Sequence, residues 1–151
     1  MQELHFLRDL FFSKENGFYI TVQPIHLLVL QLETINKMIM TTIAFRTIDW
    51  GTVERTEHKG ETGTSFWKTV QIGGLRIRIV EYSAGYIADH WCRKGHIVQC
   101  LQGDFTSEME NGESFFLSEG MTYVVSDNLS SHKSVSKNGV KLLIIDGDFL
   151  S

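Results

Sequence analysis

The chain has 151 residues, 42% of them hydrophobic, which predicts one ordinary folded domain with its own core. Its formal net charge is -4 at pH 7, so it lacks the excess of lysine and arginine that draws proteins to nucleic acids or anionic membranes. We therefore expect neither nucleic acid nor a membrane as a partner.

The beginning of the chain differs from the remainder in its pattern of apolar residues. Apolar residues recur there at roughly helical spacing, and the apolar run that starts at Ile25 is too short to span a bilayer. An acidic start without a basic segment argues against a secretory signal. We expect residues 1–37 to be a short helical or disordered N-terminal extension, or translated upstream sequence with the working start at Met38 or Met40. Residues 38–151 are then the folded domain.

The folded part reads as short strands separated by turns. The polar stretch 56–64 predicts a loop, which we take as solvated in preference to a lid. After it, strands are expected at 66–72, 75–82, 86–92, 96–101, 104–110, 113–117, 122–126, 132–136 and 140–146. Gly73 and Gly74 join the first two into a hairpin. Strands this short and evenly punctuated predict an all-β domain, either a sandwich or a closed barrel.

Strict alternation in "LRIRIVEY" separates two faces of the strand 75–82. We expect its isoleucines to face the core and Arg76 and Arg78 to lie on a solvated face, as is common in antiparallel sheets. The alternative is that both arginines line a pocket and hold a substrate carboxylate. Tyr82 and Tyr123 are candidates for the walls of that pocket.

Metal-ligating residues are concentrated in "ADHWCRKGHIVQCLQGD", which runs from Ala88 to Asp104. His90, Cys92 and His96 are all even-numbered, so unbroken strands turn them to one face, as a metal site inside a barrel requires. A single histidine or cysteine here is more often structural. Three such groups are costly to bury without a partner, and a metal ion removes that cost.

The two cysteines, Cys92 and Cys100, lie in apolar surroundings. With no secretory signal, they do not predict a disulfide framework, and a reducing cytoplasm is the expected location. Cys100 is expected to pack in the core.

The spacing of the candidate ligands resembles the first motif of the cupin family, G-x5-H-x-H-x3/4-E-x6-G. Here the pattern is G-x4-H-x-C-x3-H-x6-G, formed by Gly85, His90, Cys92, His96 and Gly103. Cysteine stands where the family has its second histidine, and His96 where it has glutamate.

The second cupin motif, G-x5-P-x-G-x2-H-x3-N, is matched in part. Gly120 opens it, residues 126–128 replace the P-x-G turn, and His132 follows one residue late. Asn128 suits the place of the turn glycine because asparagine tolerates the left-handed conformation. Ser136 departs from the final asparagine.

The segment "GYIADHWCRKGH" is similar to the corresponding segment of a group of small single-domain cupins known as DHCW-motif cupin-fold proteins. The resemblance extends over about residues 42–147. It implies a jelly-roll barrel and a homodimer. It also implies one divalent metal at the barrel mouth, with His90, Cys92, His96 and His132 as ligands. This set is softer and less anionic than three histidines with a glutamate, which favours zinc, with iron, nickel or copper as alternatives.

Three functions remain open from the sequence. The first is a small metal-binding protein, which as an enzyme would act on a small polar metabolite. The second is a metal-free module that binds or senses a small ligand. The third is a purely structural zinc site, since four bound ligands saturate a tetrahedral metal, whereas three histidines without Cys92 leave an open position.

Overall fold

The computed structural model describes residues 25–31 and 43–150. The chain divides into two units, Met1–Lys37 and Met38–Ser151, and each is described by itself. The predictions about the start of the chain concern mainly residues outside the described ranges, so they stay predictions.

In the first unit, residues 25–31 form a helix where apolar residues recur at helical spacing. Its apolar side chains, such as Ile25 and Leu28, are exposed. No helix in the described ranges combines the length and apolar character needed to cross a membrane.

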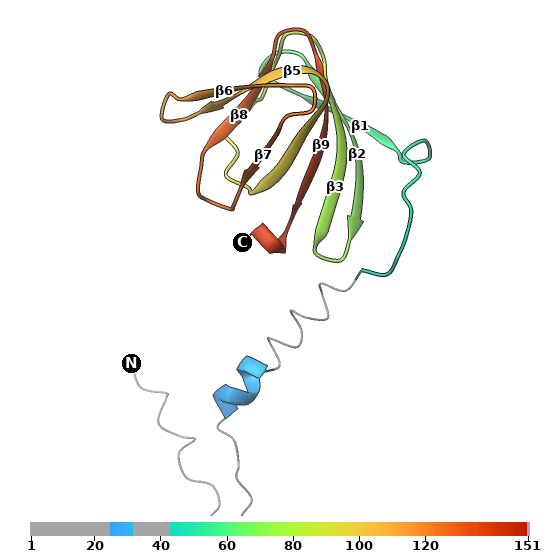
Figure 1. Cartoon of the computed structure of the whole chain (residues 1–151), viewed down its shortest axis with the longest axis vertical. Coiled ribbons are helices and arrows are strands. Elements are labelled where there is room, and N and C mark those ends of the chain that lie inside the picture. Colours follow the sequence, from blue (N-terminus) through green and yellow to red (C-terminus); the bar gives the residue numbers. More distant parts are fainter. Residues whose placement is uncertain (1–24, 32–42, 151) are drawn as a thin grey trace, which may run out of the picture. The chain divides into compact units, whose positions relative to one another are not determined.

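In the second unit, residues 43–150 form nine strands and a short 3-10 helix (Figure 1). They are β1 (Arg55–Lys59), β2 (Thr64–Ile72), β3 (Leu75–Tyr82), β4 (Tyr86–Ile87), β5 (His96–Met109), β6 (Ser114–Ser118), β7 (Thr122–Val125), β8 (His132–Ser136), β9 (Val140–Gly147) and the 3-10 helix Asp148–Leu150. The strand order is β1-β2-β3-β9-β5-β8-β4, and β6 and β7 also pair with β5. The sheet curls into an open barrel, which confirms the predicted all-β jelly roll.

β5 belongs to both halves of the barrel. Its first part pairs with β7 and β9, and its second part pairs with β6 and β8. The bend between them falls at a register shift between Cys100 and Gln102, followed by Gly103 at a φ of 83°. Two predicted strands, 96–101 and 104–110, are therefore one strand with a bulge, because a bulge turns the chain without ending the ladder.

Gly103 is required at this bend for two reasons. Its φ is in the left-handed region, and a Cβ built on it lies 2.6 Å from the carbonyl oxygen of Gly139. Gly120 shares the positive φ but has open space around its Cβ position. We expect Gly120→Ala to lower the free energy of unfolding by about 1–2 kcal/mol and Gly103→Ala by about 1–3 kcal/mol more. Urea unfolding of both variants measures the difference, and equal losses would contradict the close approach.

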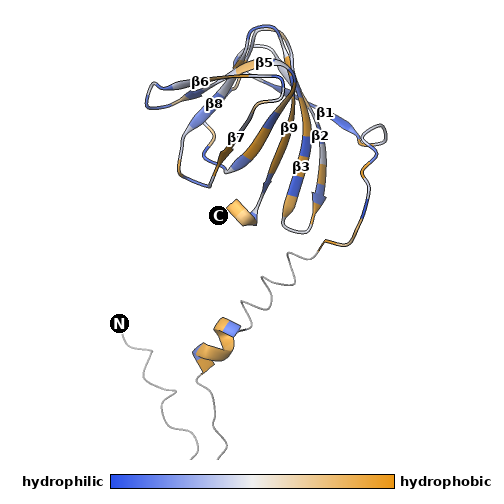
Figure 2. Ribbon diagram, in the orientation of Figure 1, coloured by the Kyte–Doolittle hydropathy of each residue, from blue (hydrophilic) through white to orange (hydrophobic). Residues whose placement is uncertain are grey.

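The interior of the barrel is lined by the even-numbered residues of β3 and β9. Val80 pairs with Leu142 in register, and both are fully buried. The wider core cluster consists of Val80, Val98, Cys100, Phe105, Leu117, Val140, Leu142 and Ile144. Figure 2 shows the alternation of apolar and polar bands along β3. Cys100 is packed in this core, as predicted.

The predicted loop 56–64 is wrong in part, because Arg55–Lys59 is strand β1. All five residues are exposed, and among the described strands β1 pairs only with β2. An edge strand whose two faces are both solvated carries no apolar alternation, so its sequence resembles a loop.

Candidate metal centre

Three candidate ligands come from separate parts of the barrel. Cys92 lies in the segment between β4 and β5, His96 is the first residue of β5, and His132 is the first residue of β8. An isolated antiparallel bridge joins two of them: the Cys92 amide donates to the His132 carbonyl at 2.7 Å, and the His132 amide donates to the Cys92 carbonyl at 3.0 Å. This backbone bridge places the cysteine beside β8.

Within the described part of the chain, Cys92, His96 and His132 form the one group of three metal-ligating residues whose ligand atoms all lie within 4.8 Å of one another. The Cys92 Sγ is 3.2 Å from the His96 Nε2. The His132 Nδ1 is 2.9 Å from the Ser130 hydroxyl, which leaves its Nε2 for another partner. The two imidazole rings meet edge-on, with centroids 5.5 Å apart.

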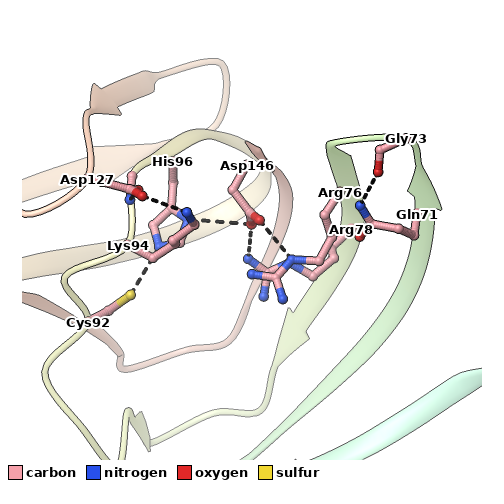
Figure 3. Close-up of polar contacts among 10 residues, drawn as sticks. Gln71, Gly73, Arg76, Arg78, Cys92, Lys94, His96, Asp127 and Asp146 are labelled. Carbon is pink, nitrogen blue, oxygen red and sulfur yellow. Dashed lines mark hydrogen bonds and ion pairs between the residues drawn. The ribbon is translucent and has the colours of Figure 1, made fainter. Parts of the chain in front are cut away.

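Asp146, on β9, lies behind His96 (Figure 3). Its Oδ2 is 3.6 Å from the His96 Nδ1 and accepts a 2.6 Å hydrogen bond from the Arg78 Nη2, while its Oδ1 accepts one of 2.8 Å from the Arg76 Nε. Burial raises the pKa of Asp146, but His96 and the two arginines outweigh burial and hold the pKa well below its usual value. The carboxylate is therefore ionised and faces the side of His96 opposite to the sulfur.

The pKa shifts of Cys92 and His132 suit a metal ion, whereas the shift of His96 favours its protonated form. Burial raises the pKa of the Cys92 thiol, but the hydrogen bond with His96, a backbone hydrogen bond at Lys94 and the charges of His96 and Arg78 together outweigh burial, so the pKa is lowered. Burial lowers the pKa of His96, but Asp146 and Cys92 outweigh burial and raise it. Burial and the neighbouring charge of His96 lower the pKa of His132 to about 4. Metal binding needs thiolate and neutral imidazole, so the lowered pKa of Cys92 and the neutral imidazole of His132 both ease it.

The spacing of one ligand pair is close to that around zinc. Zinc–ligand bond lengths with tetrahedral angles place ligand atoms roughly 3.3–3.6 Å apart, and the Cys92 Sγ and His96 Nε2 are 3.2 Å apart. All three ligand atoms lie within 4.8 Å of one another. Three ligands from the described residues would leave one position of a tetrahedral ion open. The chemistry that a metal supplies at such a site is polarisation of a bound oxygen or activation of bound water.

His90, the fourth predicted ligand, lies outside this group. Its side chain is 69% exposed, and its Nδ1 is 2.6 Å from the Asp89 carboxylate. The prediction of His90 as a ligand depended on a strand from Tyr86 to Cys92, and that strand is wrong, because β4 ends at Ile87. Side chains two residues apart point to the same face only within a strand, so nothing places His90 on the same side as Cys92.

The arginines of β3 were expected on a solvated face, but they lie on the inner face of the strand. Arg78 is 5% exposed, so the predicted solvated face is wrong for this residue. Its guanidinium carbon lies 4.8 Å from the centre of the Trp67 ring. Arg76 is further out, with 37% of its side chain exposed. Alternation separates the two faces of a strand without saying which one is inside, and here the isoleucines are on the outer, half-buried face.

The two tyrosines of the predicted pocket pack against the core beside the group. Tyr82 stacks on Tyr86 with ring centroids 4.1 Å apart, and burial and Tyr86 raise its pKa to about 12. Tyr123 meets His132 edge-on at 5.9 Å between centroids. Both tyrosines are therefore neutral hydroxyl groups near physiological pH.

The sequence interpretation missed Asp146 and Ser130. Asp146 is the single acidic residue in the apolar strand "VKLLIIDG", and such a lone charge in a buried strand was the signal available. Ser130 lies in the turn before β8, where serine is common for reasons of turn geometry alone.

A curled antiparallel barrel of this kind is the cupin fold, and solved structures share it. Ectoine synthase from P. lautus matches with a TM-score of 0.56 and 14% identity, over 68% of this chain and 78% of that one. An RmlC-like cupin from Shewanella frigidimarina matches with a TM-score of 0.56 and 15% identity, over 69% and 91%. A cupin-like protein from Thermotoga maritima matches with a TM-score of 0.55 and 16% identity, over 66% and 84%.

These likenesses show that the chain has a cupin fold. No family model matches the chain. No curated protein matches it either. The narrower resemblance to DHCW-motif proteins stays a prediction.

Proposed function

We propose that this protein is a small metal-binding cupin-fold protein that holds one divalent transition metal with Cys92, His96 and His132. The observation that carries the proposal is the convergence of the three ligand atoms within 4.8 Å of one another. A thiolate with two imidazoles favours zinc, with iron, nickel or copper as alternatives. In this arrangement Asp146 orients His96, and Ser130 orients His132.

The open coordination position supports a site that receives a small polar metabolite, rather than a purely structural zinc. A structural zinc site is closed by four protein ligands, and the exposed His90 is paired with Asp89 instead. As an enzyme, the protein would act on the metabolite at the open position. A metal-free binding or sensing module is the rival that the following experiment separates.

The test is elemental analysis of the full-length protein purified without chelator or histidine tag. We expect about one equivalent of metal per chain in the wild type and a loss of nearly all of it in His132→Ala. His90→Ala is the matched control, because it removes an exposed imidazole, and it should keep its metal. Circular dichroism checks that each variant retains its β structure. A wild-type protein without metal, or a His132→Ala protein with undiminished metal, would contradict the proposal.

Two further sequence predictions are kept as proposals, the homodimer and the cytoplasmic location. The homodimer is supported by aliphatic residues on the outer side of adjoining strands. Ile77 pairs in register with Ile145, which also pairs with Ile97. A partly exposed aliphatic face of this kind is found on surfaces that pair with another chain.

A further inference from the structure

Two buried polar atoms on the inner side of the barrel are not satisfied by the metal centre. Within the described part of the chain, the Arg78 Nε and the Ser107 Oγ have no hydrogen-bond partner. Arg78 is 5% exposed and Ser107 is 1% exposed. Buried polar groups almost always have a partner, so each unpaired one requires an explanation, such as a bound group that completes it.

Both atoms belong to the surroundings of the metal ligands. Ser107, on β5, lies near the Tyr123 hydroxyl without hydrogen-bonding geometry, and the Tyr123 ring contacts His132. Arg78 reaches the ligands through Asp146, because the Oδ2 atom that accepts the Arg78 Nη2 hydrogen at 2.6 Å is also 3.6 Å from the His96 Nδ1. The unpaired donors therefore lie around the same space as the three ligands.

The guanidinium of Arg78 is held in place before any ligand arrives. Asp146 accepts its Nη2 hydrogen at 2.6 Å, and the Trp67 ring covers it at 4.8 Å. A guanidinium fixed in this way loses little conformational entropy when its unpaired Nε–H binds an anion. Its Nε–H is thus a ready-made donor.

The centre as a whole favours a negative ligand. One thiolate, at Cys92, only partly neutralises a divalent metal, and Asp146 is already paired with Arg76 and Arg78. The charge that remains is positive, in a largely buried place where charges interact strongly.

We propose that Arg78 and Ser107 bind the carboxylate of a small metabolite beside the metal, with the Arg78 Nε–H and the Ser107 hydroxyl donating to its oxygens. The inference rests on the proposed function, because the metal supplies part of the positive charge. A carboxylate is favoured over a phosphate, since the two unpaired donors match its two oxygens, whereas a doubly charged phosphate needs more donors.

The test titrates the metal-loaded full-length protein by calorimetry with lactate and succinate, and with their uncharged amides, lactamide and succinamide. We expect at least one of the two carboxylates to bind about 10- to 100-fold more tightly than its amide, the ratio expected for a hydrogen bond to a charged group. Arg78→Met should abolish this preference. Ser107→Ala, which breaks no ion pair, should weaken carboxylate binding several-fold and leave metal content unchanged.

The outcomes separate this inference from the proposed function. Metal-loaded protein that binds each acid and its amide equally, or neither, would overturn the carboxylate site while the metal site stands. Tighter binding of inorganic phosphate than of both carboxylates would also overturn it. If the purified protein holds no metal, the proposed function fails. The same titration of that protein then supports the carboxylate site if a preference depends on Arg78, and overturns it otherwise.

Discussion

Asp146→Asn is expected to lower the free energy of unfolding by about 3–5 kcal/mol, because it leaves a buried arginine without its anion. Asp146 is 3% exposed and Arg78 is 5% exposed, and the two share a 2.6 Å hydrogen bond. Asparagine keeps the size of the side chain but removes the charge. Urea unfolding of metal-free protein measures the loss without a contribution from bound metal.

The neighbouring pair of Glu81 and Lys141 is the matched control. It joins the same two strands, at 3.1 Å, but both side chains are more than 40% exposed. Glu81→Gln should therefore change the free energy of unfolding by no more than about 1 kcal/mol. The double variant Asp146→Leu with Arg78→Met should recover part of the stability, since apolar residues replace both buried charges. An Asp146→Asn loss as small as that of Glu81→Gln would show that solvent reaches Arg78.

In protein stripped of metal, stability should fall as the pH is lowered from about 6.5 to about 4, by up to about 3 kcal/mol. The pKa of His132 is lowered from 6.5 to about 4 by burial and by His96. Below pH 6.5 the unfolded chain takes up a proton at this histidine that the folded chain excludes, so acid favours unfolding. The folded protein begins to accept the proton only near pH 4.

Other groups titrate in different windows, so the effect of His132 can be isolated. The pKa of His96 is raised, so the stability that it contributes is present below pH 6.5 and is lost as the pH rises through its folded value. The pKa of Asp146 is lowered, so its contribution is lost only below about pH 3.8. The measurement is urea unfolding of wild type and His132→Gln at pH 4 to 7 with chelator. A dependence between pH 6.5 and 4 that persists unchanged in His132→Gln would assign it to other groups.

Much of the fold could be predicted from local sequence, because turns and strand alternation are short-range properties. The strand 75–82 has the predicted bounds of β3, and 132–136 has those of β8. The hairpin at Gly73 and Gly74 is also confirmed, with Gly73 at a positive φ. These elements depend on glycine conformation and on side chains two residues apart, both of which are visible along the chain.

The candidate site was predictable only where residues lie near one another in the sequence or match a family motif. Cys92 and His96 are four positions apart, and His132 was placed by the second motif. The Cys92–His132 bridge and the end of β4 at Ile87 are set by pairing with a distant strand, so local alternation could not exclude His90.

The sequence by itself determined most of the strands and turns and three of the candidate ligands. Only the tertiary structure decided which face of β3 is inside, and thereby buried Arg78 against Asp146 of β9. The reason is physical: a two-residue repeat separates two faces, but closure of the sheet chooses the inner one, and a buried arginine is tolerated only where another strand supplies its anion.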